Sequence, residues 1–390
     1  MTRTARPAAG LGGVPFRLML GASVLAFSGY AMLLAVVPLW AARGGAGALG
    51  AGATTGVLML VTVATQGATP WLLARIGHRW VLGLGALLLG APTPLLALSA
   101  ELGPVLAVSA LRGIGFGLAT VAGSALVGEL VPRRQQGRGV AAYGLATGLP
   151  QLVFLAAGVA LVDRLGFTVV FVAAGILPVV GALIVPAVRP VERPAAVETV
   201  AGASVASRVS AAALVPVVAM LACSIAQGGL ITFLPLAVPD AGPLVAGALF
   251  GTAGGAMVGR LAGGELVDRL GWGGRLLRPG ALLAAAGMVA EVLAIGSAGG
   301  GVLLVVGAVA VGLGFGVVQN DAMTGLFTAY GSGRYGPASA VWNAAYDAGT
   351  GLGAVGLGAV ADPFGYGAAF ATAAGLCLGT VVVRGRRSAR

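Results

Sequence analysis

Long apolar segments constrain the fold of this chain more than any other feature. Each runs for about twenty residues, the length at which a helix crosses the hydrocarbon core of a bilayer, whereas the strands of a membrane barrel give alternating segments of about ten residues. Only 9% of the residues are charged and 58% are hydrophobic, while a soluble domain has about 25% charged residues. The sequence therefore predicts an all-α integral membrane protein.

The apolar segments form two sets of six on either side of a polar stretch. The first six spans are expected at residues 16–40, 46–70, 79–99, 103–127, 139–162 and 167–188. The second six are expected at 211–238, 243–263, 279–297, 301–326, 337–360 and 366–383. We therefore predict an N-terminal half at 1–188, a cytoplasmic linker at 189–210 and a C-terminal half at 211–390.

Arginine placement predicts the orientation in the membrane. Alternate connections hold clusters of arginine: Arg75 and Arg79; Arg133, Arg134 and Arg138; Arg189, Arg193 and Arg208; Arg269, Arg275 and Arg278; and Arg334. The remaining connections are poor in arginine and hold Arg43, Glu101, Asp163 with Arg164, Asp240 and Asp362. Because cytoplasmic loops carry an excess of arginine and lysine, we expect a multi-pass protein of the cytoplasmic (inner) membrane with both termini in the cytoplasm. The net charge of +11 is then explained without a nucleic-acid partner.

A charged hairpin follows the second span of each half. In the C-terminal half it contains Gly264, Asp268, Arg269 and Gly271. In the N-terminal half Arg75 aligns with Arg269 and Gly77 with Gly271, Arg79 follows, and Ala74 stands where the second copy has Asp268. Two further pairs share one offset of 199 residues: 113–117 with 312–316, and 162–167 with 361–366. The chain is therefore predicted to be a duplication, with a substrate path between its halves near the membrane midplane.

These motifs resemble the major facilitator superfamily over nearly the whole chain. The run at 263–271 is similar to that family's signature loop, 112–117 to its fourth-helix motif, and 144–150 to its fifth-helix export motif, although Leu149 separates Gly148 from Pro150. The resemblance implies twelve transmembrane helices in two pseudo-symmetric six-helix bundles, transport by alternating access, and gating by the signature loops. Because Ala74 removes the acid from the first loop, gating is expected to depend on Asp268 and Arg269 of the second.

Ionisable side chains inside the spans are candidate functional residues, because a charge at bilayer depth costs several kcal/mol unless it is paired or hydrated. Arg112 is expected to bind an anionic substrate group or an acidic partner; the alternative is a packing role against carbonyl groups. Asp321 and Asp347 are the candidates for a protonatable pair, and a structural bond from Asp347 to the signature loop is the alternative. Glu291 is expected to face lipid or the far interface.

Uncharged polar residues extend the set of candidates. Gln319 and Asn320 precede Asp321, and because consecutive helical positions differ by about 100°, the three residues cannot share one face. Asn343 lies four residues before Asp347 and is expected to share its face. Tyr30, Gln66, Gln151 and Gln227 are candidates for the cavity wall, with hydrogen bonding between helices as the alternative role.

The sequence offers no catalytic constellation, so an enzyme is not expected. His78 is the one histidine and lies in a loop, and Cys223 and Cys377 lie inside apolar segments as packing residues. No metal, cofactor or nucleotide-binding loop is expected. We predict a monomer that moves a small molecule, driven by protons, across the bilayer. The favoured hypothesis is efflux of a drug or natural product; the alternatives are a proton-coupled uptake symporter or facilitator for a small anionic metabolite, with Arg112 holding a carboxylate, and a non-transporting sensor.

Overall fold

The computed structural model describes residues 10–132, 135–188, 211–297, 300–331 and 335–382, and these residues form helices without a strand. The N-terminal half contains α1 (Val14–Leu33), α2 (Val36–Arg43), α3 (Ala48–Ile76), α4 (His78–Gly90), η1 (Thr93–Leu98), α5 (Leu102–Leu130), α6 (Gln136–Leu165), α7 (Phe167–Ile184) and η3 (Val185–Ala187). The C-terminal half contains α8 (Ala211–Ala237), α9 (Gly242–Leu270), α10 (Leu277–Ile295), α11 (Gly301–Tyr330) and α12 (Tyr335–Val382). The predicted linker, the chain termini and several predicted loop arginines lie outside the described residues.

The described helices account for the twelve predicted spans. Eleven helical stretches are long and apolar enough to cross a membrane, and the last of them, Ala338–Val382, is 45 residues long. It is interrupted at Gly365 (φ 82°, ψ 167°), which divides it into two spans. Gly166 has nearly the same conformation (φ 79°, ψ 167°) between α6 and α7. The two turns predicted to correspond at an offset of 199 residues are therefore built alike, and the twelve-helix fold is confirmed.

Two boundaries differ from the sequence prediction. The first predicted span contains a break at Leu34 and Ala35, between α1 and α2. The second span of each half is longer than predicted, because the first residues of the signature hairpins are helical. α9 continues through Asp268 and Arg269 and ends at Gly271, which caps it in the left-handed conformation that favours glycine.

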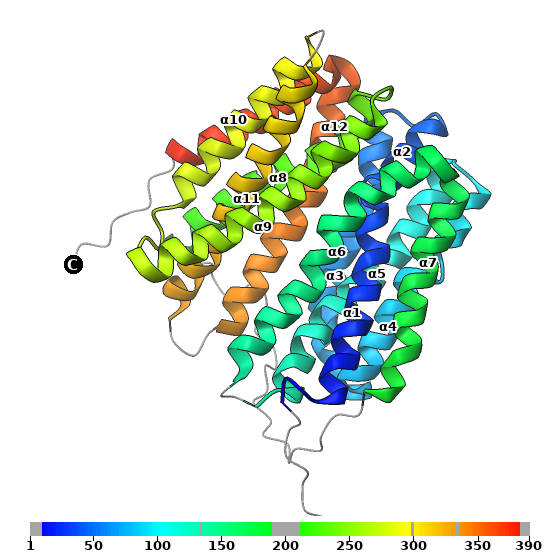
Figure 1. Ribbon diagram of the computed structural model, residues 1–390, viewed down its shortest axis with the longest axis vertical. Coiled ribbons are helices and arrows are strands. Elements are labelled where there is room, and N and C mark those ends of the chain that lie inside the picture. The colour runs from blue at the N-terminus through cyan, green and yellow to red at the C-terminus, as the bar shows by residue number, and fades with distance from the viewer. Residues whose placement is uncertain (1–9, 133–134, 189–210, 298–299, 332–334, 383–390) are drawn as a thin grey trace, which may run out of the picture.

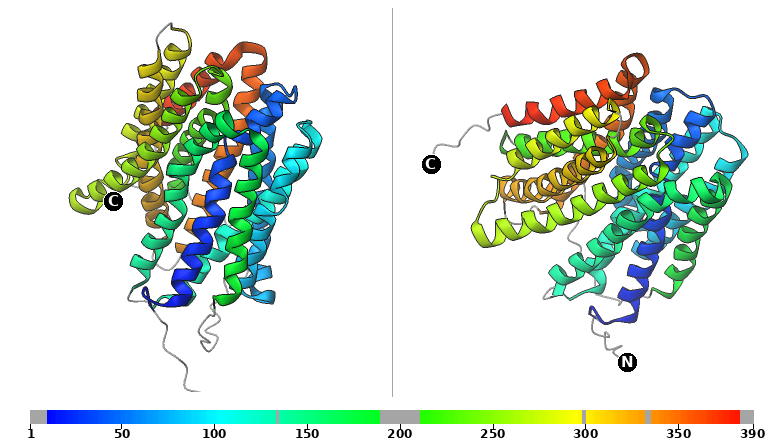
Figure 2. Two further views of the ribbon diagram at one scale, coloured as in Figure 1. Left: turned by 45° about the vertical axis from the view of Figure 1, so that its right-hand side comes forward. Right: turned by 45° about the horizontal axis from the view of Figure 1, so that its top comes forward.

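The two halves lie side by side and converge at one end (Figures 1 and 2). Contacts between them run mainly along two seams, α3 with α12 and α6 with α9, with further contacts from α8 to α2 and α3. We call the end of the bundle that carries Arg75, Arg79, Arg138, Arg269 and Arg275 the arginine-rich end. The opposite end carries the turns after α6 and in the middle of α12. Large apolar side chains such as Leu60 and Leu98 are exposed on the outside, as expected for lipid-facing helices.

Small residues set the helix spacing. The sequence predicts close helix contacts at four glycines of the eleventh span: Gly351, Gly353, Gly356 and Gly358. A methyl group built at Gly353 would meet the carbonyl oxygen and Cα of Ile225 on α8, and Gly351 and Gly358 also lie against neighbours. Gly356 differs, because a side chain there would meet open space. Close helix contact is therefore confirmed for three of the four predicted glycines, and the prediction is wrong for Gly356.

This difference gives a matched pair of variants. Gly353→Leu should lower the temperature of irreversible unfolding of the detergent-solubilised protein, because overpacking a close contact costs about 1–3 kcal/mol or more. Gly356→Leu, three residues from it toward the C-terminus on the same helix, should leave that temperature unchanged. Size-exclusion chromatography after heating measures both variants. Equal stability of the two would contradict the packing described for α8 and α12.

Candidate functional site

A cavity of about 540 Å³ lies between the two halves. Helices α1, α3 and α6 line it from the N-terminal half, and α8, α9, α11 and α12 from the C-terminal half. It extends to the arginine-rich end, where Val140 at the start of α6 and Glu265 and Asp268 near the end of α9 form its mouth. Pockets of roughly 300–1,000 Å³ bind drug-sized organic molecules, so the cavity suits a ligand of that size.

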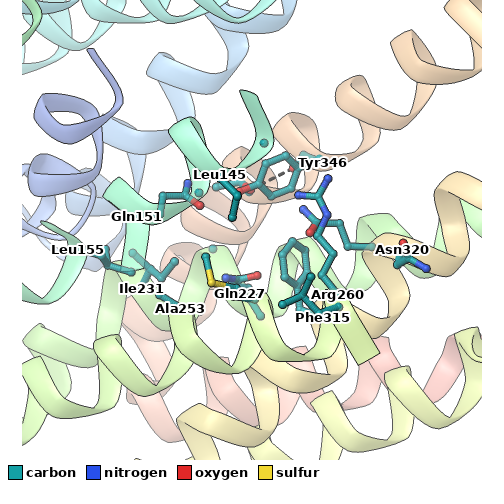
Figure 3. A pocket seen from close by; sticks show the side chains of 18 of the residues that line it. Leu145, Gln151, Leu155, Gln227, Ile231, Ala253, Arg260, Phe315, Asn320 and Tyr346 are labelled. Atoms are coloured by element: carbon teal, nitrogen blue, oxygen red, sulfur yellow. Dashed lines mark hydrogen bonds between the residues drawn. The ribbon is translucent and has the colours of Figure 1, made fainter. Parts of the chain in front are cut away.

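Most of the predicted uncharged candidates line this cavity. They are Tyr30, Gln151, Gln227, Gln319 and Asn320. Figure 3 shows Gln151, Gln227 and Asn320 around a common space with Arg260 and Tyr346. Arg260 and Tyr346 were not among the predicted candidates. From the sequence, Arg260 was grouped with the charged hairpin. It lies two helical turns before Asp268 on α9. This spacing from Asp268 was the one feature of the sequence that indicated a position deeper in the bundle.

Asp347 connects the two halves beside this cavity. Its carboxylate on α12 accepts a hydrogen bond of 2.8 Å from the amide nitrogen of Gln66 on α3, and Gln66 lies 3.5 Å from the hydroxyl of Thr120 on α5. Asp347 is 4% exposed, and Tyr346, the preceding residue, lines the cavity. The predicted alternative, a bond from Asp347 to the signature hairpin, is therefore not the contact observed.

Asp321 makes the hairpin contact instead. Its carboxylate accepts hydrogen bonds from the backbone N–H groups of Gly274, Leu276 and Leu277, at 2.6, 2.8 and 3.0 Å. These groups belong to the connection between α9 and α10 and to the first turn of α10, where N–H groups lack partners within the helix. The structure thus separates Asp321 from Asp347 and corrects the predicted pair, because Asp321 fixes the signature hairpin within one half.

Arg112 is buried within the N-terminal half rather than in the large cavity. It is 2% exposed and borders a small cavity with Ser109, Thr54 and Tyr30. The ring of Tyr30 stacks on Phe116 at a centroid distance of 3.9 Å, between α1 and α5. Direct contact of Arg112 with a molecule in the large cavity is therefore not available in this conformation.

Two other predicted positions also differ. Glu291 on α10 is buried beside Gly307 of α11 instead of facing lipid, and neither of its carboxylate oxygens has a hydrogen-bond partner among the described residues. The Asn343 amide donates to the carbonyl of Ser339 on its own helix, at 2.9 Å, and is exposed. Asn343 therefore does not share the contact of Asp347 with the N-terminal half.

The two signature hairpins make different contacts at the arginine-rich end. In the C-terminal half Arg269 pairs with Glu265 one turn earlier, while Asp268 lies at the cavity mouth and Gly264 lies beside Asn320. In the N-terminal half the turn is made by Gly77 (φ 84°). There Arg75 lies over the ring of Trp71 at 4.3 Å and Arg79 over that of Trp80 at 5.0 Å. His78 at this hairpin lies 3.0 Å from the carboxylate of Glu129 at the end of α5.

At the opposite end, two aspartates each lie at the first residues of a helix in the other half. The carboxylate of Asp362 on α12 accepts hydrogen bonds from the N–H groups of Ala48, at 2.5 Å, and Leu49, at 3.1 Å, in the first turn of α3. The carboxylate of Asp163 at the end of α6 lies against Gly242, the first residue of α9. A carboxylate at a helix N-terminus is favourable. Asp362 therefore caps α3 of the other half, and Asp163 lies beside the start of α9 in the other half. Neither contact was predicted from the equivalent positions of the two aspartates.

The described residues offer little for other kinds of chemistry. No group of three or more His, Cys, Asp or Glu side chains among them is placed to hold a metal ion. Cys223 and Cys377 are buried, and the thiol of Cys377 lies 3.7 Å from the carbonyl oxygen of Ala222.

Comparison with known proteins identifies the family. The sequence profile of the Major Facilitator Superfamily matches residues 19–333, so the chain belongs to that superfamily of membrane transporters. No curated protein matches the chain in sequence.

Solved structures of transporters share the fold. The peptide transporter POT in complex with sulfate is 15% identical with a TM-score of 0.77, over 97% of this chain and 95% of that one. A bacterial homolog of the human lysosomal transporter Spinster, in an inward-facing and unoccupied conformation, is 16% identical with a TM-score of 0.71, over 95% of each chain. The nucleoside transporter NupG is 12% identical with a TM-score of 0.71, over 95% of this chain and 98% of that one.

The contacts of Asp321 predict its role in stability. Asp321→Ala should lower the unfolding temperature in detergent by several degrees, because loss of a carboxylate leaves buried N–H groups without an acceptor, at about 1–3 kcal/mol. Asn343→Ala is the matched control, since Asn343 bonds only within its own helix. Thermal stability measured by size-exclusion chromatography compares them. An Asp321→Ala protein as stable as the control would contradict this assignment.

Proposed function

We propose that this chain is a secondary active transporter that exports a small organic molecule in exchange for protons. The observation that carries the proposal is the hydrogen bond between Gln66 and the buried carboxylate of Asp347, because it joins the two halves that must move apart in alternating access. A proton on Asp347 would remove the negative charge from this bond. Hydrogen bonds with a charged partner are about twice as strong as neutral ones, so protonation would weaken the contact between α3 and α12.

The conformation fits the cytoplasm-facing state of such a cycle. Because cytoplasmic loops are rich in arginine, we assign the arginine-rich end, where the cavity opens, to the cytoplasm. The opposite end, closed by Asp362 and Asp163, then faces the exterior. The substrate enters from the cytoplasm and contacts Tyr346 in the cavity wall, next to Asp347 in the chain. A single chain contains the whole cavity, which supports a monomer as the working unit.

Three features of α6 support export as the direction. Gly144, Leu145 and Gly148 line the cavity, and Pro150 lies inside the helix. They belong to the segment that resembles the export motif of the family, with Leu149 as the departure from its pattern. Glycine and proline allow a helix to bend, so in an exporter this part of α6 would bend as α6 moves against α9 and the substrate is released.

Asp347→Asn should abolish transport driven by a proton gradient, because the amide carries no titratable proton. Exchange of labelled substrate across the membrane should persist in part, since Asn still accepts a bond from Gln66. The measurement uses inverted vesicles that contain the overproduced protein, with a pH-sensitive dye and a panel of candidate compounds. Wild type should release protons when a substrate is added, and Asp347→Asn should not.

Matched variants separate coupling from folding in this assay. Gln66→Ala removes the donor but leaves the carboxylate, so it should change the rate of transport and retain proton release. Loss of both exchange and gradient-driven transport in well-folded Asp347→Asn protein would overturn the coupling role. Raised accumulation of substrate in cells that express the wild-type protein would overturn export and favour uptake.

The closure at the opposite end predicts a shift in conformation. Asp362→Asn should raise the population open to the exterior by about two- to fivefold, because it removes a negative charge from the N-terminus of α3, which is worth about 0.3–1 kcal/mol. The readout is the rate at which a membrane-impermeant maleimide, added outside intact cells, labels a cysteine placed at Val245. Val245 borders a cavity at this end together with Asp163 and is 1% exposed.

Asp240→Asn is the control for this labelling experiment, since Asp240 is an exposed carboxylate on the connection between α8 and α9 at the same end. Its labelling rate should equal that of the otherwise unaltered Val245→Cys protein. Equal rates in the Asp362→Asn and Asp240→Asn proteins would show that the Asp362 contact does not hold this end closed.

A further inference from the structure

Arg260 places a positive charge in the cavity wall at membrane depth. It lies on α9, four residues past the midpoint of this 29-residue helix, which is about 6 Å along the axis at 1.5 Å per residue. Its side chain extends into the cavity region beside Phe315 and near Tyr346 (Figure 3). A charge at this depth is expensive unless it is hydrated or paired, so it marks a place where a binding partner is favoured.

No carboxylate of the described chain neutralises Arg260. The ion pairs among the described residues are Arg269 with Glu265 and His78 with Glu129. Asp321 is engaged by the hairpin N–H groups, and Asp347 by Gln66. The guanidinium therefore lies at the cavity without an ion-pair partner among the described residues, near Tyr346 (Figure 3).

Closure of the cavity does not supply a partner either. The whole N-terminal half contains three carboxylates, Glu101, Glu129 and Asp163. Glu101 and Asp163 lie at the opposite end, and Glu129 lies at the end of α5 beside His78. The facing helix α6 presents Gln151 and apolar side chains to the cavity. Glu265 and Asp268 lie nearer the mouth on Arg260's own helix. When α6 approaches α9, the facing helix therefore brings no negative charge to Arg260, and an anionic ligand would supply one.

The other residues of the cavity wall indicate which kind of molecule would carry this negative charge. Phe315, Tyr346 and Tyr30 supply aromatic surface, and Leu145, Leu155, Ile231 and Met257 supply aliphatic surface. The amides of Gln227, Gln319 and Asn320 also line the cavity and can bind polar substituents. Such a wall, apolar with a few polar groups, is typical of sites for organic molecules. Arg112 does not add a second cation, because it is buried behind this wall.

We propose that the transported molecule is an organic anion with one negatively charged group on an apolar or aromatic body, and that Arg260 binds the charged group. Arginine suits this role because its planar guanidinium donates two parallel hydrogen bonds to a carboxylate. Phe315 and Tyr346 contact the apolar body, and Gln151 contacts it from the N-terminal half when the cavity closes. The inference rests on the proposed transport function and adds the substrate class and the residue that selects it.

The test compares three probes that share one body and differ in charge: 2-naphthylacetate, 2-naphthylacetamide and 2-(2-naphthyl)ethylamine. Binding to the purified full-length protein in nanodiscs is measured by equilibrium dialysis. Wild type should bind the carboxylate at least roughly tenfold more tightly than the amide or the amine. Arg260→Gln should lose this preference and keep its affinity for the amide within about twofold, which shows that the variant is folded.

Two variants serve as controls. Arg260→Lys keeps the positive charge and should retain part of the preference for the carboxylate. Arg275→Gln removes an exposed arginine on the connection between α9 and α10, outside the cavity, and should bind all three probes as wild type does. Equal binding of the three probes by wild type, a preference for the amine, no binding of any probe, or an unchanged preference in Arg260→Gln would each overturn the proposal.

Failure of this inference is distinguishable from failure of the proposed function. If another compound drives proton release that depends on Asp347 while the carboxylate is not preferred, the transport function stands and the anion inference is wrong. If the carboxylate binds through Arg260 but no compound is coupled to protons, the substrate class stands and proton coupling is wrong.

Discussion

The contact between α3 and α12 is the physical constraint on which the rest of the structure depends. Along this seam Gly52 and Gly351 bring the two halves together so closely that an added methyl group would meet atoms of the partner helix. Within lipid the hydrophobic effect does not hold helices together, so close packing and buried hydrogen bonds must do so. A polar contact lies at each end of the seam: Asp362 with the first turn of α3, and Asp347 with Gln66.

These two contacts are far apart and differ in chemistry. On α3 they are separated by the 18 residues from Ala48 to Gln66, about 27 Å of helix at 1.5 Å per residue. The outer contact joins a carboxylate to backbone N–H groups, and the inner contact joins a carboxylate to a side-chain amide. In the proposed transport cycle, rocking about this glycine-rich seam would strain one contact while it relaxes the other. At the second seam, between α6 and α9, an aspartate again lies at the start of a helix of the other half: Asp163 faces Gly242.

Much of the fold was predictable from the sequence because the bilayer dictates it. Helix length follows from membrane thickness, and the duplication follows from motifs at a constant offset, which the matching dihedral angles of Gly166 and Gly365 confirm. The hairpin boundaries were less predictable, because a glycine tolerated inside a membrane helix is indistinguishable in sequence from one that ends it. Thus Gly264 is helical, whereas Gly271 is the cap.

The functional roles of the polar residues were only partly predictable. One or two of the residues Gln319, Asn320 and Asp321 were expected to reach the cavity, and Gln319 and Asn320 line it. Asp321 and Asp347 could not be distinguished, because rotation about a helix axis depends on packing against neighbours. Arg260 was overlooked for a related reason: the extension of α9 to Leu270 places it two turns inside the bundle. In an apolar chain, the few polar residues inside the spans can be listed as candidates from the sequence. Their roles can be assigned only from their contacts in the structure.

The central claim is that the charge of Asp347 controls the contact between the halves. The most direct measurement is the distance between spin labels at Val140 and Leu261, exposed residues on the two sides of the cavity mouth, as pH is varied in nanodiscs. Cys223 and Cys377 are first replaced by alanine. We predict that the distance distribution changes with pH in otherwise wild-type protein and is independent of pH in Asp347→Asn. The same pH dependence in both proteins would contradict the account.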